Sequence, residues 1–269
     1  HKYLTEDSTL NAEEKKKFED IRYGRAGKID IMRSLQILSE FLNRYYNKGV
    51  ILLIDEYDVP MAGATSNGYY KEMLEIMKGF MQALKDNQCI KLAVITGCLK
   101  IAKESIFTGT NNFVSNTITS SQLNEYYGFV QSEVDKILED ADIKGKEEVM
   151  RKWYDGYHFG DVDVYCPWDV LCYVDDLQKN PDKKPEEYWK DTSGNAIIRS
   201  FIDYAGASIT KKFETLMNGG YIVQRVDENL TYDYLHSSEE NLWSMMYLTG
   251  YLTRVRNSEI DEKLLDNIA

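Results

Sequence analysis

The chain has 269 residues, of which 43% are hydrophobic and 28% are charged, a balance that is ordinary for globular proteins and excludes intrinsic disorder. Its formal net charge is −12 and no dense cluster of lysine and arginine occurs, so strong nucleic-acid binding is not expected. No apolar stretch approaches the roughly 18 to 20 residues of a membrane span, and no signal peptide is visible.

The cysteines lack the spacing of metal ligands and lie in or beside apolar segments: Cys89, Cys98, Cys166 and Cys172. We interpret them as reduced core thiols. Reduced thiols favour a cytoplasmic location.

Two helices are predicted before the first strand. Residues Asn11 to Ile21 form a short polar candidate. Asp30 is expected to cap a longer helix that runs to about Tyr46, with Gly49 just past its end. The apolar face of this second helix would hold Ile31, Leu35, Leu38 and Leu42.

The segment Val50 to Asp58, VILLIDEYD, is an apolar run that ends in acids. Such a run suits a buried parallel strand, and open α/β sheets bind ligands at the carboxyl ends of their strands. In P-loop NTPases a strand of this kind ends in an Asp that holds Mg²⁺. Asp55 would be that metal ligand, and Glu56 would polarise the attacking water. The alternative is a core strand that ends in solvated acids.

A second strand is predicted at Lys91 to Gly97, after a helix at Tyr69 to Asp86 with apolar residues at offsets of three and four. This order indicates a right-handed crossover unit. Thr96, at the end of the second strand, is the candidate sensor of the γ-phosphate or of the attacking water. Lys100 or Lys103 could reach a phosphate from the next turn, or could be solvated loop charges.

The next segments alternate between strand, turn and helix signals. Val114 to Thr119 predicts a third strand, Asn124 to Phe129 a turn, and Gln131 to Ala141 a helix. We expect this region to end the sheet and to lead into a helical lid.

The second region begins near Lys146 and is rich in aromatic residues between Trp153 and Trp168. Because their charged neighbours are acidic, we interpret them as a packed cluster and not as a platform for nucleobases. His158 has no partner at ligand spacing and is read as structural. Asn180 to Pro185 is the clearest linker.

After the linker, the sequence predicts two helices, followed by a further helix and a short hairpin. This order of elements favours a winged-helix-like arrangement. The expected helices are Thr192 to Ala205, Ser208 to Met217 and Glu239 to Leu248, and the expected strands are Tyr221 to Val226, Tyr232 to Leu235 and Tyr251 to Val255. Since the chain is acidic, this part is expected to pack within the protein and not to bind DNA.

Five segments together resemble the AAA-ATPase-like domain family: IDEYD, TG-x-x-K-I-A-K-E-S-I-F-x-G-x-N-N, WYDGYHFG, VYCPWDVL and YWKDTSGN. That family is similar to archaeal and STAND-type P-loop ATPases, and its members often carry a C-terminal PD-(D/E)XK nuclease domain. The resemblance extends from about residue 1 to about residue 260. One departure is Lys100, where the family usually has Arg.

A second departure is the absence of the phosphate-binding loop G-x-x-x-x-G-K-[ST]. Gly24 and Gly27-Lys28 come nearest, but their spacing is wrong and Asp follows the lysine, so we read them as a loop before a helix. In the family the loop lies upstream, and we therefore expect this chain to be a piece of a longer protein. No paired acids and lysine of a nuclease follow Arg254.

The sequence thus predicts an α/β fold: a partial P-loop NTPase parallel sheet with helices on both faces, then a mostly helical lid and a winged-helix-like domain. The expected boundaries are 1–145 for the NTPase-like part, 146–205 for the lid, 206–258 for the winged-helix-like domain and 259–269 for a linker.

Two functions are open at this point. The first is a P-loop ATPase, a molecular switch or motor, that binds Mg²⁺ and ATP in the complete protein, while this piece binds neither. The second is a catalytically silent scaffold for protein partners, since acidic and Tyr-rich surfaces suit such partners. An intact phosphate-binding loop upstream would favour the ATPase, and a degenerate one the scaffold.

Overall fold

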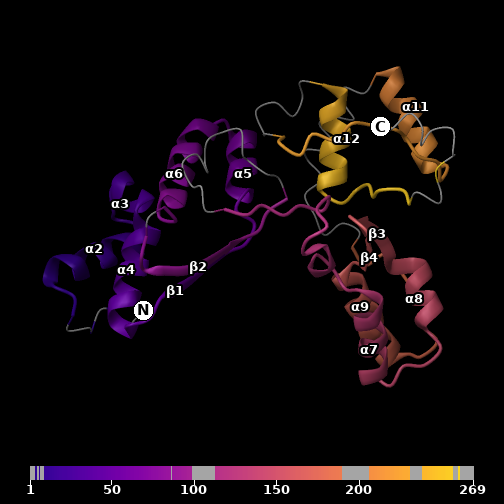
Figure 1. The fold of residues 1–269 in the computed structure, drawn as a ribbon, viewed down its shortest axis with the longest axis horizontal. Coiled ribbons are helices and arrows are strands. Elements are labelled where there is room, and N and C mark those ends of the chain that lie inside the picture. The colour runs from indigo at the N-terminus through magenta and orange to yellow at the C-terminus, as the bar shows by residue number, and fades with distance from the viewer. Residues whose placement is uncertain are drawn as a thin grey trace. The chain divides into compact units, whose positions relative to one another are not determined.

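The computed structural model describes residues 4, 6, 9–85, 87–98, 113–189, 206–230, 238–256 and 260. The fold is mixed α/β, with a small parallel sheet and helices (Figure 1). It divides into two compact units. Unit 1 comprises His1–Phe113 and Asp227–Ser237, and unit 2 comprises Val114–Val226 and Ser238–Ala269.

Unit 1 begins with three helices: α2 (Ala12–Arg22), α3 (Lys28–Met32) and α4 (Ser34–Tyr46). The predicted first helix is confirmed, and Asn11 caps it by accepting a hydrogen bond from the Glu14 backbone N–H at 2.9 Å. The prediction of a single helix from Asp30 to about Tyr46 is wrong. Asp30 lies inside α3, and Arg33, with non-helical backbone angles, separates α3 from α4.

The first core of unit 1 is formed by α2, α4 and the residues before them. Its buried members are Leu4, Leu10, Phe18, Ile37 and Phe41. Arg44 on α4 pairs with Glu14 on α2 at 2.9 Å, so the two helices are joined at the surface as well as through apolar contacts.

The sheet of unit 1 has two parallel strands, β1 (Val50–Ile54) and β2 (Ile90–Ile95), and α5 (Val59–Asn67) and α6 (Tyr70–Gln82) connect them. The predicted strand, helix and second strand are therefore confirmed. The pairing continues past the strands, since the backbone N–H of Thr96 donates to the carbonyl of Ile54 at 2.9 Å. Parallel pairing places both carboxyl ends at one edge of the sheet.

One face of this sheet is open and apolar. Ile51 pairs with Leu92 and Leu53 pairs with Val94, and all four side chains are exposed, by 59%, 53%, 72% and 46% respectively. Helices were expected on both faces. Among the described residues α4 contacts β1, but the face that bears these four side chains remains uncovered.

Unit 2 contains the 3₁₀ turn η1 (Asn124–Tyr126), the helices α7 (Gln131–Asp140), α8 (Glu147–Tyr154) and α9 (Pro167–Lys179), and the hairpin of β3 (Asp155–Phe159) and β4 (Val162–Tyr165). The turn and α7 are as predicted. The prediction of a third strand at Val114 to Thr119 is wrong, because these residues have no strand structure. A mostly helical lid was expected, and the hairpin was not.

The core of unit 2 lies between α7, α8, α9 and the hairpin. Its buried residues are Val134, Leu138, Met150, Tyr154, Tyr165, Val170, Tyr173, Val174 and Leu177. The predicted aromatic cluster is thus found in part. Tyr154 and Tyr165 are buried, but Trp153 and Trp168 are each 50% exposed.

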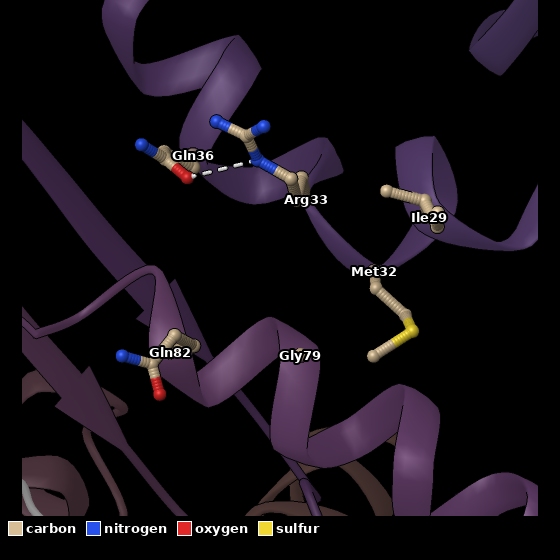
Figure 2. Close-up of a pocket in the computed structure, with 6 residues that line it drawn as sticks. All are labelled: Ile29, Met32, Arg33, Gln36, Gly79 and Gln82. Carbon is tan, nitrogen blue, oxygen red and sulfur yellow. Dashed lines mark hydrogen bonds between the residues drawn. The ribbon is translucent and has the colours of Figure 1, made fainter.

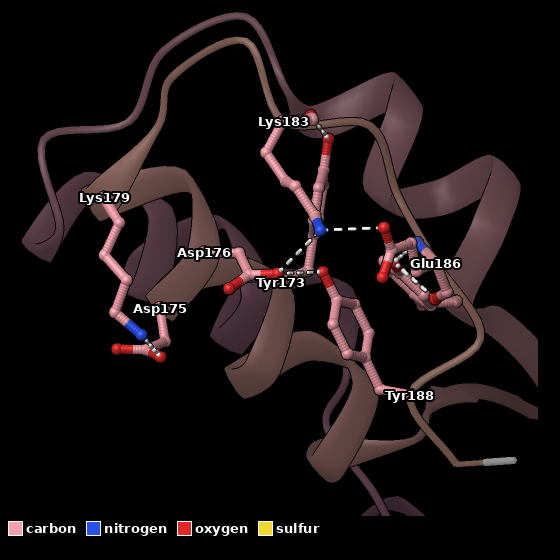
Figure 3. A network of polar contacts seen from close by, with 8 residues as sticks. Tyr173, Asp175, Asp176, Lys179, Lys183, Glu186 and Tyr188 are labelled. Atoms are coloured by element: carbon pink, nitrogen blue, oxygen red, sulfur yellow. Dashed lines mark hydrogen bonds and ion pairs between the residues drawn. The ribbon is translucent and has the colours of Figure 1, made fainter.

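Residues 180–189, here called the strap, are held against α8 and α9 (Figure 3). Tyr188 donates to Asp176 at 2.8 Å, and Tyr173 donates to the Lys183 carbonyl at 3.2 Å. Tyr154 donates to the Glu186 carbonyl at 3.0 Å and accepts from the Glu186 backbone N–H at 3.1 Å. The segment that the sequence analysis reads as a linker is therefore fixed at several points.

The hairpin of unit 2 is tied to the C-terminal part of the chain by polar contacts. Asp163 accepts hydrogen bonds from His158 at 2.7 Å and from Arg256 at 2.8 Å, and His158 donates its backbone N–H to Thr253 at 2.8 Å. Burial raises the pKa of Asp163, but these two partners outweigh it and hold the pKa below its usual value. A structural role for His158 agrees with these contacts.

The last helices of unit 2 are α11 (Ala207–Met217) and α12 (Glu239–Leu248), close to two of the predicted helices. The expected strands Tyr221 to Val226 and Tyr251 to Val255 are irregular. Thr192 to Ala205 and Tyr232 to Leu235 lie outside the described residues. The described part therefore contains no hairpin of a winged helix.

The four cysteines are free, but the prediction that they are core thiols is wrong. Cys98 is exposed, and Cys89, Cys166 and Cys172 are only partly buried. Cys89 and Cys98 lie in the loops before and after β2, Cys166 lies at the start of α9, and Cys172 lies within α9.

We expect Tyr154→Phe to lower the free energy of unfolding by about 1–3 kcal/mol, because it leaves both backbone groups of Glu186 without their partner. Urea unfolding followed by circular dichroism measures this change. Tyr126→Phe is the matched control, since Tyr126 is 76% exposed, and it should leave the stability unchanged. Equal stabilities of the two variants would show that the strap contributes nothing.

Candidate functional site

The candidate site lies at the carboxyl ends of β1 and β2. Asp55 follows β1 and Thr96 follows β2, and the parallel register brings the two residues side by side. The Thr96 hydroxyl donates a hydrogen bond to Oδ1 of Asp55. Two residues that the sequence analysis assigned to one site, 41 positions apart, are thus in contact.

Thr96 orients the acidic loop as well as the Asp55 carboxylate. Its hydroxyl oxygen lies 3.4 Å from the backbone N–H of Glu56, which donates to it, and its carbonyl accepts from the Tyr57 backbone N–H at 3.0 Å. One residue therefore holds three consecutive positions after β1. A serine or threonine is suited to this, because its hydroxyl group both donates and accepts.

Glu56 adopts a left-handed backbone conformation, with φ of 52°. This conformation is uncommon outside glycine, asparagine and aspartate and tends to mark functional turns. It reverses the chain between β1 and α5, and the Glu56 carbonyl then accepts from the Val59 backbone N–H at 3.1 Å. The Glu56 side chain and the Asp55 side chain are both exposed at this turn.

Asp58 forms the buried wall of the site. Its side chain is only 2% exposed, and Oδ1 accepts a hydrogen bond from the Cys98 backbone N–H at 3.2 Å. Burial, followed by the negative charges of Asp58 and Glu56, raises the pKa of the Cys98 thiol. The third acid of the motif therefore connects the two loops, while the first two face outward.

Gly97 is required where the two loops meet. A Cβ atom at this position would lie 2.6 Å from Oδ1 of Asp58 and 2.6 Å from two atoms of the Tyr57 ring. From the sequence, Gly97 was predicted only as the last residue of the second strand. The close approach that fixes glycine there became visible only with the fold.

The oxygen ligands of this site suit Mg²⁺. Mg²⁺ usually binds to proteins through one or two carboxylates and completes its shell with water and substrate phosphates. Asp55, exposed and oriented by Thr96, offers such a carboxylate. Among the described residues no group of three His, Cys, Asp or Glu side chains is arranged as a metal site, so a cation here would depend on ligands beyond the protein side chains.

The nearest match to a phosphate-binding loop is a turn that leads into a short helix. Lys28 begins the short helix α3 and forms an ion pair with Glu75 on α6, and Gly24 has a left-handed turn conformation. The reading of these residues as a loop before a helix is confirmed. Lys100 and Lys103, the other candidate phosphate ligands, lie outside the described residues.

A separate pocket of about 270 Å³ lies between α3, α4 and α6 (Figure 2). It is lined by Ile29, Met32, Arg33, Gln36, Gly79 and Gln82. Gly79 lets α6 approach α3 closely, since a Cβ atom there would lie 2.5 Å from Cβ of Met32. None of the site residues predicted from the sequence lines this pocket.

The N-terminal part of the chain matches a family model. Residues 2–107, which include the acidic strand and Thr96, match the family described as Predicted AAA-ATPase, AAA-ATPase-like. These residues are similar to the AAA-ATPase-like family. The resemblance stated from the sequence is confirmed here, and the motifs after residue 107 lie outside the match.

One relative is an uncharacterised protein in the vnfD 5′ region of Azotobacter chroococcum mcd 1. It is 27% identical to the chain over 146 residues, which is 53% of this chain and 27% of the relative. The chain therefore spans about a quarter of the length of that relative. No solved structure matches the chain.

No helix among the described residues is both long and apolar enough to cross a bilayer.

We expect Gly97→Ala to destabilise unit 1 by about 1–3 kcal/mol, because the added methyl group overlaps the side chains of Asp58 and Tyr57. Gly63→Ala is the control. Gly63 lies in α5 with no atom within 4 Å of an added Cβ, so alanine should stabilise by about 0.5–1 kcal/mol. Thermal unfolding of both variants measures the difference. Equal melting temperatures would contradict the close packing at Gly97.

Proposed function

We propose that the complete protein is a P-loop ATPase, a molecular switch or motor, and that this chain supplies its acidic strand and its sensor residue. Asp55 would hold Mg²⁺, Glu56 would orient the attacking water, and Thr96 would respond to the γ-phosphate. Lys100 and Lys103 are proposed to contact phosphate oxygens. The match of residues 2–107 to the AAA-ATPase-like family supports this proposal.

The observation that carries the proposal is the contact between Thr96 and Asp55. Ligands of open α/β sheets bind at the carboxyl ends of the strands, and here two polar residues from neighbouring parallel strands meet at that edge. A structural cluster of acids would be expected to pair with lysine or arginine. Within the described residues no ion pair is formed by Asp55 or Glu56, and both side chains are exposed.

Asp55 and Glu56 have distinct chemical roles in the proposal. A hard dication neutralises the carboxylate that it binds, so Asp55 would be occupied by Mg²⁺ and would not act as a base. Glu56 extends from the left-handed turn, separate from the Thr96 hydrogen bond to Asp55. It is therefore available to accept a proton or to position a water.

The open face of the sheet supports the proposal that a strand and a helix with the phosphate-binding loop complete this domain in the full protein. Parallel sheets are normally covered on both faces. The exposed Ile51, Leu53, Leu92 and Val94 are the type of surface on which a helix packs. Backbone N–H groups at the start of such a helix would supply the phosphate cradle that the described residues lack.

The remaining assignments are proposals of the same kind. The boundaries proposed from the sequence are 1–145 for the nucleotide domain, 146–205 for a lid, 206–258 for a domain that packs on it and 259–269 for a linker, whereas the described residues of α7 pack with α8 and α9 in unit 2. We place the complete protein in the cytoplasm. These proposals rest on the resemblance of the motifs.

We expect Glu56→Gln to reduce ATP turnover of the complete protein by about 100-fold or more, because the amide cannot accept the proton of the attacking water. Phosphate release under saturating ATP and Mg²⁺ measures the rate. Glu72→Gln is the matched control, since Glu72 is an exposed acid on α6, and it should keep the parental rate. Equal turnover in the Glu56 and Glu72 variants would remove Glu56 from the mechanism.

The chain as described should bind ATP with Mg²⁺ no more tightly than about millimolar. Exposed Asp55 and Glu56 repel the nucleotide phosphates, and no phosphate cradle is present among the described residues. Isothermal titration calorimetry tests this. Micromolar affinity would show that the chain contains its own phosphate site, for example near Gly24 to Lys28. A complete protein that also fails to bind ATP would support the scaffold function instead.

A further inference from the structure

Half-exposed apolar side chains occur on α9 and at the end of the strap. Trp168 is 50% exposed, Leu171 49% and Trp189 50%. Trp168 and Leu171 are three positions apart on α9 and so lie on one side of this helix. Trp189 follows Tyr188, whose carbonyl accepts a hydrogen bond from the Trp168 indole N–H at 3.2 Å. We call these three residues the tryptophan patch.

In the described part of unit 2, Trp168 and Leu171 do not belong to the buried core. The opposite side of α9 already provides the buried residues Val170, Tyr173, Val174 and Leu177. The polar atom of the Trp168 ring is also satisfied by the Tyr188 carbonyl. The exposed part of Trp168 is therefore apolar ring surface, which makes no hydrogen bond to the described residues.

The strap holds the tryptophan patch in position. Tyr188 is bound to Asp176 at 2.8 Å, and Lys183 lies 2.8 Å from Glu186 and 3.4 Å from Asp176 (Figure 3). The backbone that carries Trp189 is thus attached to α9 just before that residue. A surface that is ordered before binding loses less conformational entropy when a partner docks.

Tryptophan residues in such positions commonly dominate the binding energy of protein interfaces. Contiguous exposed apolar surface is also a mark of interaction sites. Trp153, equally exposed on α8, has no comparable partner in the strap among the described contacts. The combination of a fixed backbone, a satisfied indole and an adjacent leucine distinguishes the tryptophan patch from a single exposed ring.

The charge around the tryptophan patch indicates a cationic partner. Residues 167–189 contain six acidic residues and three lysines. Two of these lysines, Lys179 and Lys183, are already paired with acids of the same segment. Burial, followed by the charges of Asp169, Asp175 and Asp176, raises the pKa of Cys172, in agreement with a negative local field. Nucleic acids and anionic lipid surfaces would be repelled.

We propose that the tryptophan patch is a docking surface for a basic segment of a protein partner. An arginine of the partner stacks on the ring of Trp168, because the planar guanidinium group binds both to aromatic faces and to nearby carboxylates. An aliphatic side chain of the same segment contacts Leu171. This surface lies outside residues 2–107, and the proposal does not depend on ATP hydrolysis.

The test uses the 269-residue chain and a short fluorescent amphipathic peptide of arginine and leucine, followed by fluorescence anisotropy. We expect saturable binding that Trp168→Ala and Leu171→Ala each weaken about tenfold or more. Trp153→Ala, an equally exposed tryptophan on α8, is the matched control and should bind within about twofold of the parent. Circular dichroism of each variant confirms that it is folded.

Several outcomes would overturn the proposal. One is the absence of saturable binding up to about millimolar peptide. Another is an equal loss of affinity in the Trp153 and Trp168 variants, which would show unspecific contact with exposed aromatic rings. A third is equal binding of a peptide in which glutamate replaces arginine. Tighter binding of single-stranded DNA than of the arginine peptide would assign the patch to nucleobase stacking instead.

Discussion

The parallel register of two short strands is the constraint on which the candidate site depends. It brings the end of β2 beside the end of β1, so that the Thr96 hydroxyl reaches the Asp55 carboxylate and the Thr96 carbonyl reaches the backbone N–H of Tyr57. A shift of one residue would turn the side chains of one strand to the opposite face and separate Thr96 from Asp55. The chemistry of the acidic loop therefore follows from the pairing of β1 with β2.

The same two strands leave much apolar surface in contact with water. Burying a leucine, isoleucine or valine side chain fully contributes about 1.5–3 kcal/mol, and four such side chains on the open face forgo most of that contribution. The run Val50 to Ile54 is apolar on both faces, as in strands that are covered on both sides. The apolar sequence and the exposure of these side chains together favour a sheet whose open face is covered in the complete protein.

The sequence predicted the elements whose pattern is strong. The apolar runs of β1 and β2 and the helical spacing of α6 each specify one structure, and all three are found. Predictions from weaker patterns were wrong where contacts between residues distant in the sequence determine the local structure. The hairpin of β3 and β4 was not predicted, and Asn180 to Pro185 were read as a linker because of their prolines and lysines. No local signal shows that three tyrosines hold the strap.

The candidate site shows the same division. The types of its residues, and their positions at strand ends, could be predicted because a parallel sheet gathers the ends of its strands at one edge. The left-handed conformation of Glu56 could not, since a glutamate rarely adopts it without contacts such as the Tyr57 backbone bond to Thr96. Asp58 is buried and accepts a hydrogen bond from the Cys98 backbone N–H, so it supports the loop. One apparently uniform acidic motif therefore combines two exposed carboxylates with one that fixes the loop carrying them.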